Sequence, residues 1–154
     1  MKEELFARYY NSSLRFLSYR PRSELEVREN LVKKKASPEI IEAVIARLKE
    51  YKFLDDLEFA KWFVKSRTST KPKAGRIIKM ELKQKGIDEE TIGDLKLTVD
   101  DLDNAKKLVN KKMDKYEGLK RQELYEKLGG FLARRGFNWE TIKKAIDETI
   151  ASGV

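Results

Sequence analysis

A weak internal repeat of about fifty residues is the feature that most constrains what this chain can fold into. Three leucines recur 51 and 50 residues apart, and each is followed six residues later by a helix N-cap residue and ten residues later by an isoleucine. In chain order these sets are Leu31, Ser37 and Ile41; Leu82, Asp88 and Ile92; and Leu132, Asn138 and Ile142. Leucine, cap and isoleucine recur in one register, which is typical of a tandem array of supersecondary units.

Each copy carries the signals of three short helices. Apolar residues recur at helical spacing almost throughout, and no sustained alternation of apolar and polar residues indicates a strand. Ser23 and Glu26 match a capping box, and Ser37 places a cap directly before a first-turn proline. The sequence therefore predicts an all-α fold, an elongated and curved array of three tandem three-helix repeats at residues 1–54, 55–96 and 97–154.

Two of the three repeats place a glycine two residues before the cap, at Gly86 and Gly136. Such a glycine ends a helix in the left-handed region without a steric cost from a Cβ atom. The first repeat has Lys35 at this position. We therefore expect that junction either to tolerate strain or to turn differently.

The residue inventory excludes several classes of chemistry. Without cysteine or histidine, the chain cannot form disulfides, Ser-His-Asp or Cys-His catalytic sites, or zinc sites with nitrogen or sulfur ligands. Glycine-rich phosphate loops are also missing, and Gly129-Gly130 falls within a helical pattern. No segment has the apolar length of a signal-peptide core or a membrane span. We expect a soluble cytoplasmic protein that is not an enzyme and needs neither metal nor cofactor.

Clustered aspartates are the remaining candidates for chemistry. Asp55 with Asp56, and Asp100 with Asp101 and Asp103, have the donor type for magnesium or for general acid–base catalysis. Each cluster lies at a predicted helix start, where carboxylates cap backbone amides and complement the helix dipole. We interpret both clusters as helix caps.

Basic residues offer the best candidate binding surface. The chain has 34 lysine and arginine residues against 26 aspartate and glutamate residues, and this net charge of +8 favours an acidic partner. The predicted basic surface comprises Lys73, Arg76, Lys79, Lys83, Lys107, Lys111, Lys115, Arg134 and Arg135. Its first four members have the spacing of one helix face in the middle repeat, and the three lysines from 107 to 115 follow one face of the next repeat's first helix. The alternative is that these residues form ordinary solvated helix faces.

Aromatic residues fall mostly on or beside predicted apolar stripes. This set is Tyr9, Tyr10, Phe59, Trp62, Phe63, Phe131, Phe137 and Trp139, of which Trp62 fits its stripe least well. We interpret the set as core residues rather than as a platform for stacking nucleic-acid bases. A helix-turn-helix reader is conceivable, but the candidate recognition helices carry no cluster of Asn, Gln and Arg at their starts. Sequence-specific DNA recognition is therefore not predicted.

Four segments together resemble the RecX family of regulatory proteins. They are R-P-R-S-E-L-E at 20–26, F-L-D-D-L-E-F-A at 53–60, K-G-I-D-E-E-T-I at 85–92 and R-R-G-F-N-W-E-T-I at 134–142. The resemblance spans nearly the whole chain in family order and at family spacing. It implies three tandem three-helix repeats, in agreement with the internal repeat, although Lys35 departs from the glycine pattern.

The resemblance also implies a function. RecX-like proteins bind the RecA recombinase and lodge in the helical groove of its nucleoprotein filament, where they suppress filament growth, strand exchange, ATP hydrolysis and coprotease activity. The expected protein is a monomeric, non-enzymatic regulator of homologous recombination, DNA repair and the SOS response, with at most weak direct contact to DNA. The alternative is a general nucleic-acid-binding helical array that acts on DNA directly.

One experiment would test the predicted basic surface. If the surface faces the filament, charge reversal of Arg76 and Lys83 together is expected to abolish inhibition without unfolding the protein.

Overall fold

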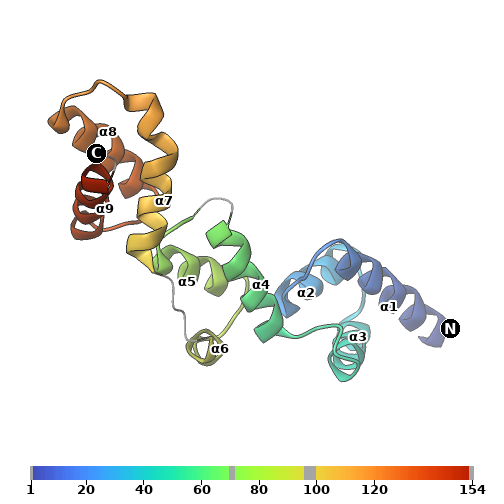
Figure 1. Cartoon of the computed structure of the whole chain (residues 1–154). Helices are drawn as coiled ribbons and strands as arrows, with labels where there is room; N and C mark the ends of the chain where they lie inside the picture. The colour runs from blue at the N-terminus through green and yellow to red at the C-terminus, as the bar shows by residue number, and fades with distance from the viewer. Residues whose placement is uncertain (1, 70–71, 96–99, 153–154) are drawn as a thin grey trace. The chain divides into compact units, whose positions relative to one another are not determined.

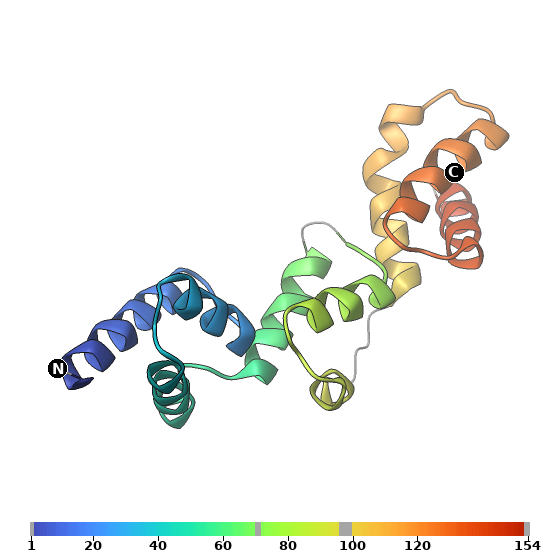
Figure 2. The same cartoon turned by 180° about the vertical axis from the view of Figure 1, so that it is seen from behind.

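The computed structural model describes residues 2–69, 72–95 and 100–152 (Figures 1 and 2). Within these ranges the regular structure is helical and no strand is present, which confirms the all-α prediction. The elements in chain order are α1 (Lys2–Tyr19), α2 (Glu24–Lys33), α3 (Pro38–Glu50), α4 (Asp56–Ser69), α5 (Gly75–Gln84), α6 (Glu89–Asp94), α7 (Asp101–Met113), the 3-10 helix η1 (Asp114–Tyr116), α8 (Arg121–Arg134) and α9 (Trp139–Ser152). Successive helices group in threes, as the tandem array requires, and we call these groups the first, second and third repeats.

By its internal contacts the chain divides into two compact units. The first unit is Met1–Phe63 with Leu82–Lys96, and the second is Val64–Glu81 with Leu97–Val154. The first unit thus holds the junction between the first repeat and the ends of the second, and the second unit holds the junction between the second repeat and the third.

Each unit has a core built on its repeat leucines. In the first unit α2 and α3 bury Val27, Leu31, Val44 and Leu48 completely. In the second unit Leu128 and Leu132 of α8 pack in one cluster with buried residues of α7 and α9. Burying each such aliphatic side chain contributes roughly 1.5–3 kcal/mol, so these residues fix how the helices of each unit pack.

The repeat register is present in the structure. Leu31, Leu82 and Leu132 are all fully buried, and the three isoleucines are at most 7% exposed. Each predicted cap accepts a hydrogen bond from the amide three residues later, at 3.3 Å for Ser37, 2.7 Å for Asp88 and 2.8 Å for Asn138. The sequence periodicity therefore reports a repeated helix–turn–helix geometry.

The same left-handed turn closes the second helix of every repeat. Lys35, Gly86 and Gly136 have φ angles of 66°, 82° and 92°. In each case the next amide donates to the carbonyl of the repeat leucine five residues earlier, at 3.0–3.2 Å. This is the Schellman arrangement, and it satisfies carbonyls that a helix end would otherwise leave unpaired. Of the two expectations for Lys35, tolerance of strain is correct.

Most aromatic side chains are at least partly buried, but the interpretation of Trp139 as a core residue is wrong. Trp139 is 59% exposed at the first position of α9. Its ring edge lies against Gly129 of α8, where an added Cβ would be 3.5 Å from the indole, and its centroid is 6.3 Å from that of Tyr125. The indole therefore covers the surface of α8 instead of entering the core.

Among the described residues no helix is both long enough and apolar enough to cross a membrane.

Candidate functional site

The structure places the predicted basic surface on four elements and the segments beside them. Arg76, Lys79 and Lys83 share one face of α5, while Lys73 precedes that helix, so its predicted place on the helix is wrong. Similarly, Lys107 and Lys111 lie on α7 but Lys115 lies in η1, because the chain tightens into a 3-10 turn after Met113. Arg134 ends α8 and Arg135 is its C-cap.

Three members of the predicted basic surface form ion pairs. Lys73 lies 2.9 Å from Glu81, Lys83 lies 3.1 Å from Glu89, and Lys107 lies 3.1 Å from Asp103. Burial alone would raise the pKa of Glu81, but hydrogen bonds from Lys73 and Arg67 lower it below its ordinary value. The pairing reduces the positive charge that these lysines present to a partner.

Four members of the predicted basic surface are exposed and make neither an ion pair nor a side-chain hydrogen bond within residues 2–69, 72–95 and 100–152. They are Lys79, Lys111, Lys115 and Arg134. Their charges are compensated by no carboxylate in this part of the chain, so they are the members best suited to contact an anionic partner.

The two remaining arginines stabilise the junction in the second unit. Nε of Arg76 donates a 2.8 Å hydrogen bond to the carbonyl of Gly136, and the carbonyl of Arg135 accepts one of 3.2 Å from the amide of Ala74. The Arg135 guanidinium lies 5.0 Å from the ring centroid of Phe131. Reversing the charge of Arg76 would therefore also remove a hydrogen bond between α5 and the third repeat, so the stability of that variant has to be measured together with its inhibition.

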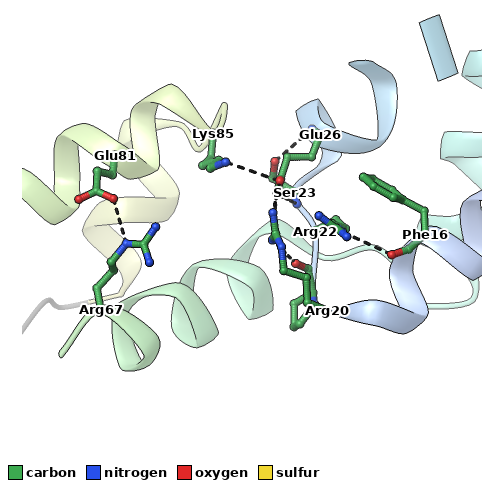
Figure 3. Close-up of polar contacts among 9 residues, drawn as sticks. Phe16, Arg20, Arg22, Ser23, Glu26, Arg67, Glu81 and Lys85 are labelled. Carbon is green, nitrogen blue, oxygen red and sulfur yellow. Dashed lines mark hydrogen bonds and ion pairs between the residues drawn. The ribbon is translucent and has the colours of Figure 1, made fainter. Parts of the chain in front are cut away.

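The equivalent junction in the first unit centres on Glu26, at the start of α2 (Figure 3). Its carboxylate accepts from the Ser23 amide at 3.1 Å and from Arg20 at 2.5 Å, and Lys85 lies 3.6 Å away. Burial would raise the pKa of Glu26, but the hydrogen bonds from Arg20 and Ser23 lower it. The capping box is confirmed, whereas its link to Lys85 was not predicted.

The aspartate clusters cap helices, as predicted, and they do so in two ways. Asp55 accepts from the Leu57 amide of its own helix at 2.9 Å, and Asp100 accepts from the Asp103 amide at 3.1 Å. Their neighbours Asp56 and Asp101 instead accept from the first amides of α2 and α5, which belong to the preceding repeats, at 2.8 and 2.9 Å.

The aspartates do not gather with other ligands into a metal site. No group of three or more carboxylates able to hold a metal ion occurs in the described ranges. The clusters thus contribute to the fold and to the junctions between repeats, and the exposed cations remain the candidate binding residues.

Comparison with known proteins gives the same three-part organisation. Three family models match in order: RecX, first three-helix domain, at residues 10–48; the second at 55–94; and the third at 99–146. The boundaries lie within the predicted repeats.

Relatives and solved structures carry the same family name. The chain is 39% identical to the regulatory protein RecX of Bacillus subtilis (strain 168) over 142 residues, which are 90% of this chain and 54% of that protein. It is 33% identical to the regulatory protein RecX of Prosthecochloris aestuarii over 144 residues, covering 92% and 93%. The crystal structure of RecX from Lactobacillus salivarius superposes with a TM-score of 0.79 at 25% identity, covering 95% and 97% of the two chains.

The chain spans about half the length of the Bacillus relatives that it matches. It nevertheless matches all three domain models and covers nearly the whole of the Prosthecochloris protein. With its repeat register, its capped junctions and these matches, the chain belongs to the RecX family of regulatory proteins.

Proposed function

We propose that this chain is a non-enzymatic cytoplasmic regulator that binds the RecA recombinase and its nucleoprotein filament. In this role it inhibits filament growth, ATP hydrolysis, strand exchange and coprotease activity, and so modulates homologous recombination, DNA repair and the SOS response. The observation that carries the proposal is membership of the RecX family across all three repeats.

The distribution of charge supports this role. Lys79, Lys111, Lys115 and Arg134 are exposed without an ion pair in the described part of the chain, and the net charge is +8. Such charges speed encounter with an anionic partner and make binding weaken as salt is added. Several repeats in one chain also allow contacts with neighbouring protomers of a filament to reinforce one another.

A second candidate function is direct binding to nucleic acid. The same unpaired cations suit phosphate groups as well as carboxylates, and phosphate contacts need no particular base sequence. The two functions differ in whether tight binding requires the recombinase.

The deciding experiment is ATP hydrolysis by RecA on single-stranded DNA as this protein is titrated in below one copy per RecA, at two salt concentrations. Binding to the same DNA without RecA is measured in parallel. Suppression well below one copy per RecA, with weak binding to bare DNA, supports the filament-directed inhibitor. Suppression that begins only when the DNA is saturated supports direct competition for DNA, and no suppression contradicts the proposed inhibition.

A further inference from the structure

The first unit contains an open apolar groove of about 920 Å³ between α1 and α3. Its walls include Leu5, Phe6 and Tyr10 of α1 and Ile40 and Ala43 of α3. Leu5 is 41% exposed there, although it is a large apolar side chain. An exposed apolar surface of this kind, lying along two helices, is typical of a site that receives a partner helix.

The aromatic wall of the groove is braced by contacts within the first repeat. The rings of Phe6 and Tyr10 stack with centroids 5.7 Å apart, and the Arg47 guanidinium lies 4.6 Å from the centroid of Phe6. The hydroxyl of Tyr9 donates to the carbonyl of Lys34 at 3.2 Å. Because these contacts hold the side chains in place, a partner would meet a preformed surface.

The repeat register shows what kind of surface this is. Lys35, Ser37 and Ile40 line the groove, and 51 residues later Gly86, Asp88 and Thr91 line a pocket against Glu24 in the first turn of α2. The glycine of the third repeat likewise approaches a helix start, because an added Cβ on Gly136 would lie 2.3 Å from Cγ1 of Ile77 on α5. In the second and third repeats this surface packs against the beginning of a helix of the preceding repeat. The equivalent surface of the first repeat forms the groove.

The chemistry of the groove differs from that of the two occupied surfaces. Asp56 and Asp101 cap the helix starts that contact the second and third repeats, whereas the residue 51 positions before Asp56 is the apolar Leu5 of α1, which follows Glu3 and Glu4 in the first turn of that helix. The lining of the groove holds the cations Lys2, Lys35 and Arg47 and the carboxylates Glu3 and Glu39, so its cations outnumber its carboxylates. It thus suits a helix that is apolar on one face and brings its own carboxylates in its first turn, where they also complement the helix dipole.

We infer that this groove docks a helix of the recombinase, apolar on its inserted face and acidic in its first turn. The inference rests on the proposed function, because it takes the recombinase as the partner. A second copy of this chain fits less well, since two chains of charge +8 repel each other.

The test compares two alanines on α3. Ala43 lines the groove, Ala46 does not, and both are exposed. Chains labelled at the C-terminus are titrated with RecA filaments on single-stranded DNA, and the dissociation constant is measured by fluorescence anisotropy. Ala43→Glu is expected to weaken binding at least tenfold through steric block and charge repulsion, while Ala46→Glu stays within twofold of the unsubstituted chain. Leu5→Glu provides a second variant on the opposite wall, and thermal unfolding checks that each variant is folded.

The outcomes separate the groove from the proposed function. Equal binding by the folded Ala43→Glu and Leu5→Glu variants overturns the groove assignment and leaves the regulator intact, whereas failure of the unsubstituted chain to bind filaments overturns both. Sedimentation measures self-association of the same variants, and their binding to DNA without RecA is measured in parallel. A self-association that Ala43→Glu abolishes would assign the groove to a second copy, and an equal loss of bare-DNA binding would assign it to nucleic acid; either result overturns the inference.

Discussion

The amide of Glu24 donates a 2.8 Å hydrogen bond to Oδ1 of Asp56, so a carboxylate of the second repeat caps a helix of the first. The amide of Gly75, 51 residues after Glu24, donates in the same way to Oδ1 of Asp101 at 2.9 Å. In both Asp-Asp pairs the first aspartate caps its own helix and the second caps the helix of the preceding repeat. The junctions are therefore built from directional polar contacts as well as from packing.

Removing the cap between repeats should cost more than removing a surface charge from the same helix. Asp101→Ala leaves the Gly75 amide without its charged acceptor and is expected to lower the free energy of unfolding by roughly 1–2 kcal/mol. Asp103→Ala breaks only an exposed pair with Lys107 and should cost about 0.5 kcal/mol or less. Urea unfolding of the two variants measures the difference, and equal losses would contradict the role given to Asp101.

Gly136 cannot accept a side chain unless the side chain of Ile77 on α5 moves. An added Cβ would lie 2.3 Å from Cγ1 of Ile77, and the φ angle of 92° is itself unfavourable for alanine. Gly136→Ala is expected to lower the free energy of unfolding by roughly 2–4 kcal/mol, the sum of overpacking and backbone strain. Gly118→Ala is the matched control, because Gly118 has a φ of 88° with open space around it, and should cost about 1 kcal/mol. If both variants unfold at the same urea concentration, the close approach to Ile77 has no energetic weight.

Lys35 holds the left-handed position that glycine holds in the other two repeats. Its φ angle of 66° is strained for a residue with a Cβ atom, so Lys35→Gly is expected to raise the free energy of unfolding by roughly 0.5–1 kcal/mol after the entropic cost of glycine. The neighbouring Lys34 has an ordinary φ of −84°, and Lys34→Gly should give no such gain. Differential scanning calorimetry checks both, and a lower Tm for Lys35→Gly would show that the lysine side chain outweighs its strain.

Acid should weaken both units through their paired glutamates. Burial would raise the pKa of Glu24, Glu26 and Glu81, but hydrogen bonds from basic side chains lower each below its ordinary value of 4.5. Their stabilising contribution is therefore fully present above pH 4.5 and is lost as the pH falls through the lower folded-state values. Asp56 acts in the opposite direction, because burial raises its pKa, and so offsets part of the loss.

The acid effect can be assigned by substitution. Glu26→Gln should make the urea midpoint fall less steeply between pH 6 and pH 3, roughly the range over which a depressed carboxyl titrates. Glu140→Gln, at an exposed position on α9, should leave the slope of the unsubstituted protein unchanged. Identical slopes for Glu26→Gln and the unsubstituted protein would rule out Glu26 as a source of the acid effect.

The unpaired cations can be tested without disturbing the junctions. Lys79→Glu combined with Lys111→Glu is expected to weaken inhibition of RecA ATP hydrolysis at least tenfold and to reduce its salt dependence. Lys143→Glu combined with Lys144→Glu makes the same change in net charge at exposed positions outside the predicted basic surface. Measuring the inhibition of RecA ATP hydrolysis by both double variants separates the effect of local contact from that of net charge. Equal inhibition by the two would show that Lys79 and Lys111 do not contact the partner.

Sequence patterns predicted the fold wherever the determinant is local. The repeat leucines, the caps Ser37, Asp88 and Asn138, and the capping box at Ser23 depend on residues within one or two helical turns, and all are confirmed. The conformation of Lys35, in contrast, is not determined by its local sequence. The pattern showed that its position was unusual, but the choice between strain and a different turn depended on the energy of the whole repeat.

Contacts between distant residues could not be read from spacing. Arg76 has the helical register of an exposed basic face, yet its bond to Gly136 joins residues 60 positions apart. Likewise Lys85 approaches Glu26, and Asp56 reaches Glu24, through the packing of successive repeats. The Asp-Asp pairs carried a signal for these contacts. One aspartate is enough to cap its own helix, so the second is available to accept a hydrogen bond from an amide of another helix.

The two caps between repeats also determine when α2 and α5 gain their capping carboxylates during chain synthesis. The acceptor for the Glu24 amide lies 32 residues further along the chain, and that for the Gly75 amide lies 26 residues further along. Because the ribosome releases the N-terminus first, α2 and α5 each emerge before the aspartate that completes them. A nascent chain of 54 residues already contains α1, α2 and α3, but its second helix is finished only when the next repeat begins.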